Sequence, residues 1–502
     1  METGAVSASA SGSAGPLCNI SPFGGNGAAD QAGGAAAGGG PGAARTLWAP
    51  RAWLRGGWAE HVLLRIDATG HWAEITPGTA TPPAGAEVLP GSVLPGLVNA
   101  HSHAFQRAFV GLAERRDSAH DDFWSWRDRM YGVALRITPE QLHAVACHLY
   151  AELLQGGYTH TCEFHYLHHA QDGQPYADEA TMCRALAQAA QDTGMGLTLL
   201  PVLYERAGFA QPRLRADQRR FAADVARVQR LRDAVRGWQL PGVGAGVAVH
   251  SLRAAAPASI HALARLCDGD PGPIHIHIAE QTGEVDDCVA ATGARPVEWL
   301  ACELPLDSRW QLVHATHATP SEIAAVAATG AGVVLCPGTE ANLGDGLCDL
   351  PRWLASGTPL AVGSDSQVTR SWPEELRWLE YGQRLQLRQR NVAADPAAQP
   401  ATAARLFGAV LAGGAAAAGG LQGAAHAGLQ PGAHADLLLL NTADPALAGV
   451  PPSHALDALV FAAPAVPFAR VMARGQWRDN TDGAQAQTAR FVHAVQACNA
   501  AR

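Results

Sequence analysis

The chain contains no lysine, so all 36 of its basic residues are arginine. This absence excludes catalysis through a lysine Schiff base and a metal centre bridged by a carbamylated lysine, because both need an amine side chain. Charged residues make up only 16% of the 502 residues, and the net charge is −9. No basic stripe is present to pair with a phosphate backbone, so we expect no nucleic acid partner.

Disulfide motifs and long apolar runs are also missing. The ten cysteines are scattered, with no CxxC pair, which is typical of reduced thiols in a cytosol rather than of structural disulfides. The N-terminus lacks the basic region followed by an apolar run that would indicate a secretory signal. The most apolar helical stretch, 406–421, is too short and too weakly hydrophobic to cross a bilayer. We therefore expect a cytoplasmic protein without membrane contact.

The two ends of the chain differ in texture from its middle. Residues 1–44 consist mostly of Gly, Ala and Ser, which cannot bury enough surface to offset the entropy of ordering, so a disordered tail is expected. Residues 45–92 and 431–480 contain short β-like runs between Gly and Pro turns. We expect these two stretches to form one small β-sandwich domain. Residues 481–502 are expected to form a C-terminal helix.

Residues 93–430 alternate apolar strands with amphipathic helical stretches, which predicts an α/β fold with a parallel sheet. Helices are expected at 139–155, 178–193 and 216–235, and the alanine-rich stretch 410–428 resembles an insertion. Eight such strand–helix units fit a closed (β/α)8 barrel of the TIM type, in which catalytic groups lie at the carboxyl ends of the strands. The eight candidate strands are 94–103, 158–166, 196–204, 246–253, 273–280, 310–317, 332–337 and 359–365.

The first candidate strand ends with His101, Ser102 and His103. Because strand side chains alternate, both imidazoles project from one face, and both can bind a single metal ion if they are neutral. A lone His-x-His pair is more often accidental than ligating. Its position directly after an apolar strand, and similar residues on later strands, favour the metal-binding interpretation here.

The fifth candidate strand carries two histidines, His275 and His277, and Glu280 follows. Alternation places both histidines on one face and does not choose between them. His277 lies nearer the carboxyl end of the strand, with a carboxylate three residues later. We therefore expect His277 to be the ligand and Glu280 the acid–base group, with His275 deeper in the barrel.

His314 and Asp365 end the sixth and eighth candidate strands. An aspartate after an apolar strand is costly to bury unless it is paired or metal-bound, although a helix N-cap is an alternative. His314 alone is equally well explained as a core histidine. Together, however, polar groups end five of the eight strands and meet at one rim. Three histidines and one aspartate suit a borderline divalent metal such as zinc, which activates water. Asp365 could then accept a proton, and Glu280 could deliver one to a substrate nitrogen.

These motifs also show a family resemblance. The segments PGLVNAHSH, HIHIAEQ, LVHATH and GSDS resemble the amidohydrolase superfamily, in particular its mononuclear deaminase branch. Further segments spread over residues 90–440, such as FWSWRDRMY, EFHYLHH, GVAVHSLRAA and CPGTEANLGDG, resemble the deiminases that act on formimidoylglutamate. This resemblance implies hydrolysis of N-formimidoyl-L-glutamate to N-formyl-L-glutamate and ammonia in histidine degradation.

The resemblance also implies roles for individual residues. One divalent metal ion, zinc in preference to iron or another metal, would bind to His101, His103, His277 and Asp365. Proton transfer would fall to Glu280, His314 and Asp365. The small dicarboxylate substrate would contact Gln106, Arg127, Tyr166, His250 and Arg253. Arginine forks and a tyrosine hydroxyl suit two carboxylates. Without the resemblance, Arg127 and Tyr166 would be assigned to the surface or the core. Arg253 would be explained equally well as a surface arginine and as a site residue.

Two other functions are compatible with the motifs. A related deaminase could act on a nucleobase or triazine, but a flat neutral ring favours aromatic stacking, whereas this rim offers arginines. A barrel without catalysis could serve only for binding, but such a protein would normally lack one ligand. Whether the chain forms a homodimer is left open by the sequence.

Overall fold

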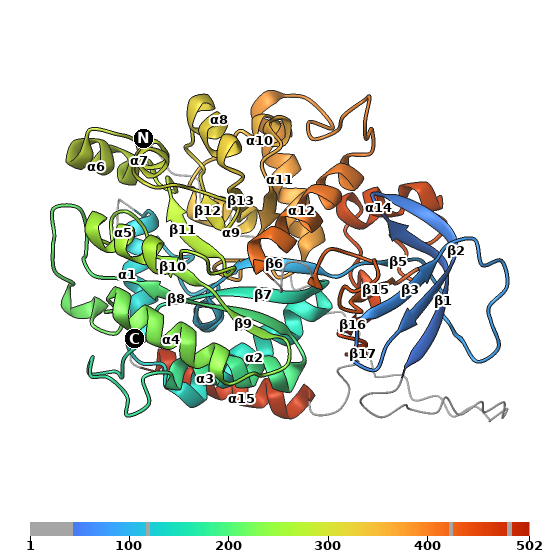
Figure 1. Cartoon of the computed structure of the whole chain (residues 1–502), viewed down its shortest axis with the longest axis horizontal. Helices are drawn as coiled ribbons and strands as arrows, with labels where there is room; N and C mark the ends of the chain where they lie inside the picture. Colours follow the sequence, from blue (N-terminus) through green and yellow to red (C-terminus); the bar gives the residue numbers. More distant parts are fainter. Residues whose placement is uncertain (1–43, 117–120, 421–424, 479–483, 501–502) are drawn as a thin grey trace, which may run out of the picture. The chain divides into compact units, whose positions relative to one another are not determined.

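The structure, a computed structural model, describes residues 44–116, 121–420, 425–478 and 484–500. Its largest part is a barrel of parallel strands that pair in chain order (Figure 1). The ring is closed by a bridge between Ser102 and Asp365, beside which Asp365 N donates to His101 O over 3.0 Å. The predicted (β/α)8 barrel is therefore confirmed. Its strands are β6 (Leu97–Ser102), β7 (Tyr158–His165), β8 (Gly196–Leu203), β10 (Val247–Val249), β11 (Ile274–Ile278), β12 (Trp310–His314), β13 (Gly332–Leu335) and β14 (Leu360–Val362).

The barrel strands are apolar runs whose residues are buried on both faces, as in β8. Such burial is expected where a parallel sheet is covered by helices. The fourth strand is shorter than predicted: residues 246–253 were expected, but β10 ends at Val249. His250 and Arg253 therefore lie in the turn beyond β10, at the carboxyl rim of the barrel.

Helices connect the strands and cover the outside of the barrel (Figure 1). Short 3-10 turns occur at η1 (Ala104–Ala108), η2 (Ala216–Gln218) and η3 (Pro452–His454), and β9 (Val243–Ala245) pairs with β8. The helices are α1 (Phe123–Ala134), α2 (Pro139–Gln155), α3 (Thr181–Thr193), α4 (Val225–Gly237), α5 (Pro257–Leu266), α6 (Thr282–Thr292), α7 (Pro296–Glu303), α8 (Pro320–Thr329), α9 (Pro337–Leu343), α10 (Leu350–Ser356), α11 (Trp372–Leu387), α12 (Thr402–Ala418), α14 (Ala455–Phe461) and α15 (Ala484–Asn499).

Capping residues explain where two of the three predicted helices begin. The third, predicted at 178–193, begins as α3 only at Thr181 and has no side-chain cap. The bounds of α2 agree with the prediction, because Thr138 and Gln141 form a capping box at its first turn. The helix predicted from residue 216 is wrong at its start, since residues 216–218 form a 3-10 turn instead. The helix itself, α4, begins only after its N-cap Asp224, whose side chain accepts a hydrogen bond from Arg227 N over 2.8 Å.

The alanine-rich stretch is part of the barrel, not an insertion. Its residues 410–418 form the second half of α12, which packs against β6 and β14. A Cβ atom on Gly413 would lie 2.0 Å from Leu360 O, so only glycine allows this close approach. At the end of α12, Ala417 O accepts a hydrogen bond from His275 Nε2 over 2.9 Å. This places His275 deep in the barrel, as predicted.

Both ends of the chain contribute to a second, mostly antiparallel sheet, as expected. All of its strands join one continuous sheet in the order β17-β16-β15-β5-β1-β2-β3, with β4 on β1, and the two chain ends meet where β5 pairs with β15. The sheet has its own core, which includes Leu47, Leu64, Trp72, Leu437 and Met472. The strands are β1 (Arg45–Leu54), β2 (Gly57–Ile66), β3 (Trp72–Thr76), β4 (Glu87–Val88), β5 (Val93–Leu94), β15 (Leu437–Leu440), β16 (Phe468–Ala473) and β17 (Gln476–Trp477).

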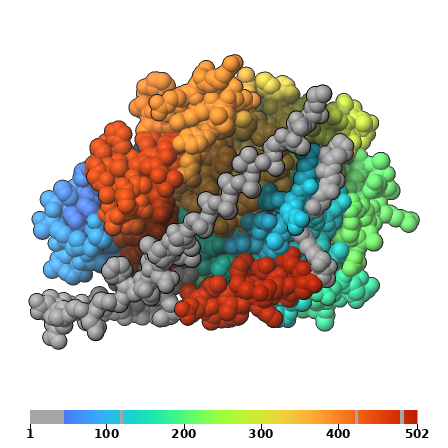
Figure 2. Space-filling model, turned by 180° about the vertical axis from the view of Figure 1, so that it is seen from behind, coloured from blue at the N-terminus to red at the C-terminus, as the bar shows by residue number. Residues whose placement is uncertain are grey.

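The last described helix, α15, packs along α2 (Figures 1 and 2), and Gln487 Nε2 donates to Cys147 O over 2.5 Å. Among the described residues, no helix combines the length and the apolar character that crossing a membrane requires. The predicted disordered tail falls almost entirely on residues 1–43, outside the described part of the chain.

Candidate active site

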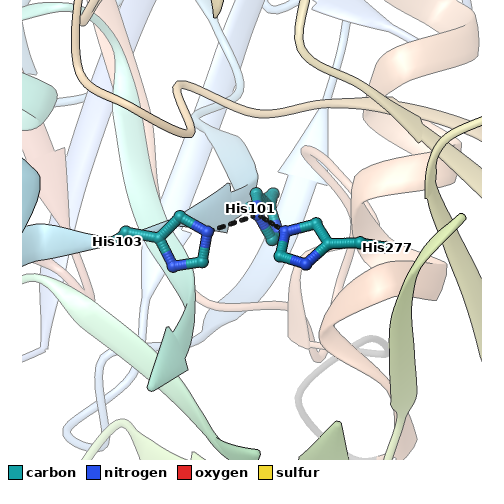
Figure 3. A group of neighbouring side chains, drawn as sticks. All are labelled: His101, His103 and His277. Carbon is teal, nitrogen blue, oxygen red and sulfur yellow. Dashed lines mark hydrogen bonds between the residues drawn. The ribbon is translucent and has the colours of Figure 1, made fainter. Parts of the chain in front are cut away.

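Three histidine rings converge at the carboxyl rim of the barrel (Figure 3). His101 Nε2 lies 3.1 Å from His103 Nε2 and 3.0 Å from His277 Nε2. The second ring nitrogens of the outer two are already in use: His103 Nδ1 donates to Phe164 O over 2.9 Å, and His277 Nδ1 donates to His250 O over 3.0 Å. In the neutral rings, both Nε2 atoms therefore carry a lone pair that is directed at His101.

This arrangement fits a bound cation. Burial lowers the pKa of His101 to about 3 and lowers the pKa values of His103 and His277 as well, so the rings are neutral. A neutral His101 can donate from Nε2 to only one of its two neighbours. Asp365 Oδ1 lies 3.5 Å from His101 Nε2 and 3.4 Å from His103 Nε2. Three imidazole nitrogens and one carboxylate oxygen form a donor set that suits a borderline divalent metal.

A buried acid–base group adjoins these residues. His314 Nε2 lies 3.8 Å from Glu280 Oε1 and 3.8 Å from Asp365 Oδ2. Burial raises the pKa of Glu280 to about 7. Burial alone would lower the pKa of His314, but the carboxylates of Glu280, Glu340 and Asp365 together raise it to about 10. Glu280 can therefore hold or release a proton near neutral pH, while His314 stays charged.

The sequence analysis assigned no role to Glu340. Its Oε1 atom accepts hydrogen bonds from His314 Nδ1 over 3.2 Å and from Cys336 N over 2.9 Å. This contact fixes the ring of His314 with Nε2 toward Glu280 and Asp365. The only signal in the sequence is a carboxylate shortly after the seventh strand, and a carboxylate at the start of a helix is usually only a cap.

The residues expected to contact substrate lie in the same place. Gln106 on η1, Arg127 on α1, and Tyr166, His250 and Arg253 after their strands all line one cavity. The same cavity is lined by His103, His277, Glu280, His314 and Asp365. His101 is fully buried beside it. The structure thus brings together all the site residues that the sequence predicted.

Two arginines in this cavity keep unpaired N–H groups. Arg127 Nε and Arg253 Nη1 are buried and have no hydrogen-bond partner among the described residues. Trp124 lies beneath both guanidinium groups. The centre of its ring is 4.6 Å from the guanidinium carbon of Arg127 and 5.1 Å from that of Arg253. Stacking thus holds the two groups while leaving Arg127 Nε and Arg253 Nη1 without a partner, although Arg127 Nη2 lies 3.8 Å from Asp128 Oδ1. The unpaired donors favour an anionic ligand. The sequence analysis missed Trp124, because a tryptophan on a helix resembles a core residue.

Comparison with known proteins assigns the chain to a family. Residues 92–478 match the amidohydrolase family. The chain is 47% identical to the formimidoylglutamate deiminase of Pseudomonas aeruginosa, with 89% of this chain and 98% of that protein covered. The crystal structure of an amidohydrolase from Brucella melitensis has a TM-score of 0.83 at 41% identity, covering 90% of this chain and 99% of that one. An adenosine deaminase from Xanthomonas campestris with bound zinc shares the fold, with a TM-score of 0.73 at 22% identity, covering 91% and 98%. The chain therefore belongs to the amidohydrolase family.

Proposed function

We propose that the chain hydrolyses N-formimidoyl-L-glutamate to N-formyl-L-glutamate and ammonia, a step of histidine degradation. The observation that carries this proposal is a pair of arginines, Arg127 and Arg253, that keep buried, unpaired N–H groups in the same cavity as the histidine cluster. A glutamyl substrate brings two carboxylates, and each guanidinium can bind one. The name of the similar Pseudomonas aeruginosa protein, formimidoylglutamate deiminase, supports the same substrate.

The donor set supports one divalent metal ion, zinc, held by His101, His103, His277 and Asp365. Members of this family use a divalent metal, and zinc is bound in the Xanthomonas campestris relative. When bound, such an ion lowers the pKa of water enough for attack at neutral pH.

The substrate is oriented by charge. Arg127 and Arg253 would bind its two carboxylates through charge-assisted hydrogen bonds. Gln106 Nε2 donates to the Tyr166 hydroxyl over 3.2 Å, while Gln106 Oε1 has no partner among the described residues. These two side chains and His250 leave polar atoms for the formimidoyl group and the glutamyl nitrogen bonded to it.

The proton transfers follow from the carboxylates. Water adds to the formimidoyl carbon, and Asp365 accepts its proton beside His314. Glu280 delivers a proton to the terminal nitrogen of the substrate and then takes the remaining proton of the added hydroxyl, while Asp365 passes its proton to the same nitrogen. The C–N bond to that nitrogen breaks, and ammonia leaves. The oxygen from water remains on the carbon as a formyl group. A pKa of about 7 for Glu280 suits a group that must hold a proton and then release it.

Aromatic side chains also line the cavity, which bears on the alternative of a heterocyclic substrate. The centre of the Tyr131 ring lies 5.6 Å from the guanidinium carbon of Arg127, and Trp124 stacks under both arginines. These rings therefore support the guanidinium groups, and the unpaired donors favour an anion over a neutral ring.

All nine described cysteines are free thiols, which supports our placing the enzyme in the cytoplasm.

Ammonia release tests the proposal. The purified protein is assayed with N-formimidoyl-L-glutamate, with a formimidoyl compound that lacks one carboxylate, and with 8-oxoguanine and adenosine. We expect kcat/KM to be highest for N-formimidoyl-L-glutamate. Faster turnover of either heterocycle would refute the proposed substrate, and no turnover of any compound by the zinc-loaded protein would favour a binding function instead.

A further inference from the structure

A second cluster of metal-binding side chains lies outside the active site, between α2 and α3. His143 and Cys147 are four residues apart and so share one face of α2. Cys147 Sγ lies 3.5 Å from His143 Nε2, and His143 Nε2 lies 2.9 Å from Asp192 Oδ2 on α3. All three ligand atoms lie within 4.8 Å of one another.

We propose that His143, Cys147 and Asp192 bind a second divalent, thiophilic metal ion of the Zn²⁺ type. One nitrogen, one sulfur and one oxygen ligand suit this class and are unsuited to Mg²⁺ or Ca²⁺, which prefer oxygen alone. In a tetrahedral zinc site with Zn–N and Zn–S bonds of about 2.0 and 2.3 Å, the N and S ligands lie about 3.5 Å apart. The separation between His143 Nε2 and Cys147 Sγ already has this value.

The surroundings leave room for a fourth ligand. The three residues line a cavity of about 360 Å³, so water can complete a tetrahedron without separating the helices. Asp192 is already oriented, because its Oδ1 atom accepts a hydrogen bond from Gln188 Nε2 over 2.7 Å. Its Oδ2 atom is therefore the one directed at His143.

Charge balance also permits a divalent ion. Cys147 would release its thiol proton to solvent on binding, so that a thiolate and the Asp192 carboxylate offset the two positive charges of the ion. Arg490, which lines the same cavity, then borders a neutral site. Without an ion the thiol is unreactive, since burial and then the charge of Asp192 raise the pKa of Cys147 to about 12.

An ion here would join two helices rather than take part in catalysis. Helix α2 leads into β7, and α3 connects β7 to β8. A link between the two helices would brace this side of the barrel from outside, as α15 does where it packs on α2. The expected effect is on thermal stability, with the reaction rate unchanged.

Cobalt substitution tests the proposal, because a thiolate bound to Co²⁺ gives a near-ultraviolet charge-transfer band that imidazole and carboxylate ligands do not give. The holoenzyme is exchanged into Co²⁺, and absorbance and bound cobalt are recorded. We expect the band in the wild type. In Cys147→Ser the band should be lost, bound cobalt should fall by one equivalent per chain, and kcat/KM should remain within about twofold.

Cys336→Ser is the matched control, since Cys336 lies with His314 and Asp365 at the active site. The band should survive this change. His143→Ala, at a half-exposed position, gives a second test should Cys147→Ser fold poorly, and it should weaken the band. No band in the wild type, or a band lost in Cys336→Ser and kept in Cys147→Ser, would overturn the proposal.

Discussion

His277 Nε2 lies 3.0 Å from His101 Nε2, although 176 positions separate the two histidines in the chain. Each is held by its own strand, and His277 Nδ1 is fixed by the carbonyl oxygen of His250. Two neutral rings whose ring nitrogens meet at this distance, with a third beside them, gain most from a shared cation. The contact is therefore the most specific mark of a metal centre in the described part of the chain.

Removal of one proposed ligand should release the metal from this centre. We expect His101→Ala and Asp365→Asn to weaken metal binding by more than the roughly 10- to 100-fold typical of outer partners of a ligand. Most activity should be lost as well. Metal content and ammonia release after dialysis against a chelator measure both effects.

The count of ions is checked in the Cys147→Ser background, where the second proposed site is absent. One equivalent per chain with full activity is expected there. Two equivalents, both needed for activity, would contradict a mononuclear centre.

Glu280→Gln should keep the metal and lose turnover. Glu280 lies 3.8 Å from His314 and is not needed to complete the donor set of three histidines and Asp365. We expect kcat to fall by about 10²- to 10⁴-fold, the usual range for a positioned proton-transfer group. Metal loss as large as in His277→Ala would instead make Glu280 a ligand, and the assigned role would be wrong.

Arg127→Met and Arg253→Met should each lower kcat/KM for N-formimidoyl-L-glutamate. A charge-assisted hydrogen bond contributes roughly 1.5–3 kcal/mol, which corresponds to about a 10- to 200-fold loss. Lysine at either position should restore activity only in part, because it keeps the charge but loses the planar fork.

The matched substrate is a formimidoyl compound that lacks the relevant carboxylate. Its turnover should change little in the same variants, because no charge is left to pair. Equal losses on both substrates would indicate a folding defect, and changes within about twofold on both would remove the arginines from the substrate site.

Stability should fall with pH below about 6.5, in part through His160. This ring is fully buried, and its Nε2 atom lies 2.9 Å from Thr198 Oγ1. Burial, together with the charges of His426 and His434, lowers the pKa of His160 well below 6.5. The folded state therefore stays neutral while the unfolded state takes up a proton, so stability is full above pH 6.5 and is lost as the pH falls.

His160→Gln isolates this contribution, because glutamine keeps an N–H donor but cannot be protonated. From pH 6.5 downward, the wild type should lose about 1.4 kcal/mol per pH unit more than the variant. Urea unfolding at several pH values measures the difference. Parallel pH profiles for the two proteins would show that His160 does not titrate in this way.

The strand ends could be predicted because their geometry is regular. Side chains alternate along a strand, and the carboxyl ends of barrel strands meet at one rim, so the meeting of His101, His103, His277 and Asp365 at that rim could be predicted from position. Glu340 and Trp124 lie on helices α9 and α1. How a helix lies over the rim depends on tertiary packing, which a local pattern does not encode.

The alanine-rich stretch shows a different limit. Its small residues suggested an insertion without a core, yet they allow α12 to approach β14 so closely that Gly413 has no room for a side chain. Low hydrophobicity in a sequence therefore does not distinguish a segment that packs nothing from one that packs backbone against backbone.

The bridge between Ser102 and Asp365 has a consequence for how the enzyme comes into being. His101 and His103, at the end of β6, are synthesised early on the ribosome. Asp365 follows only after β14, when the ring can close. An ion bound to these residues would link β6 and β14 where the ring closes. A nascent or truncated chain that ends before residue 365 could not retain the ion. In the finished protein, loss of the ion would first loosen β6 and β14, whereas β10, which lies opposite the seam and carries no proposed ligand, would be least affected.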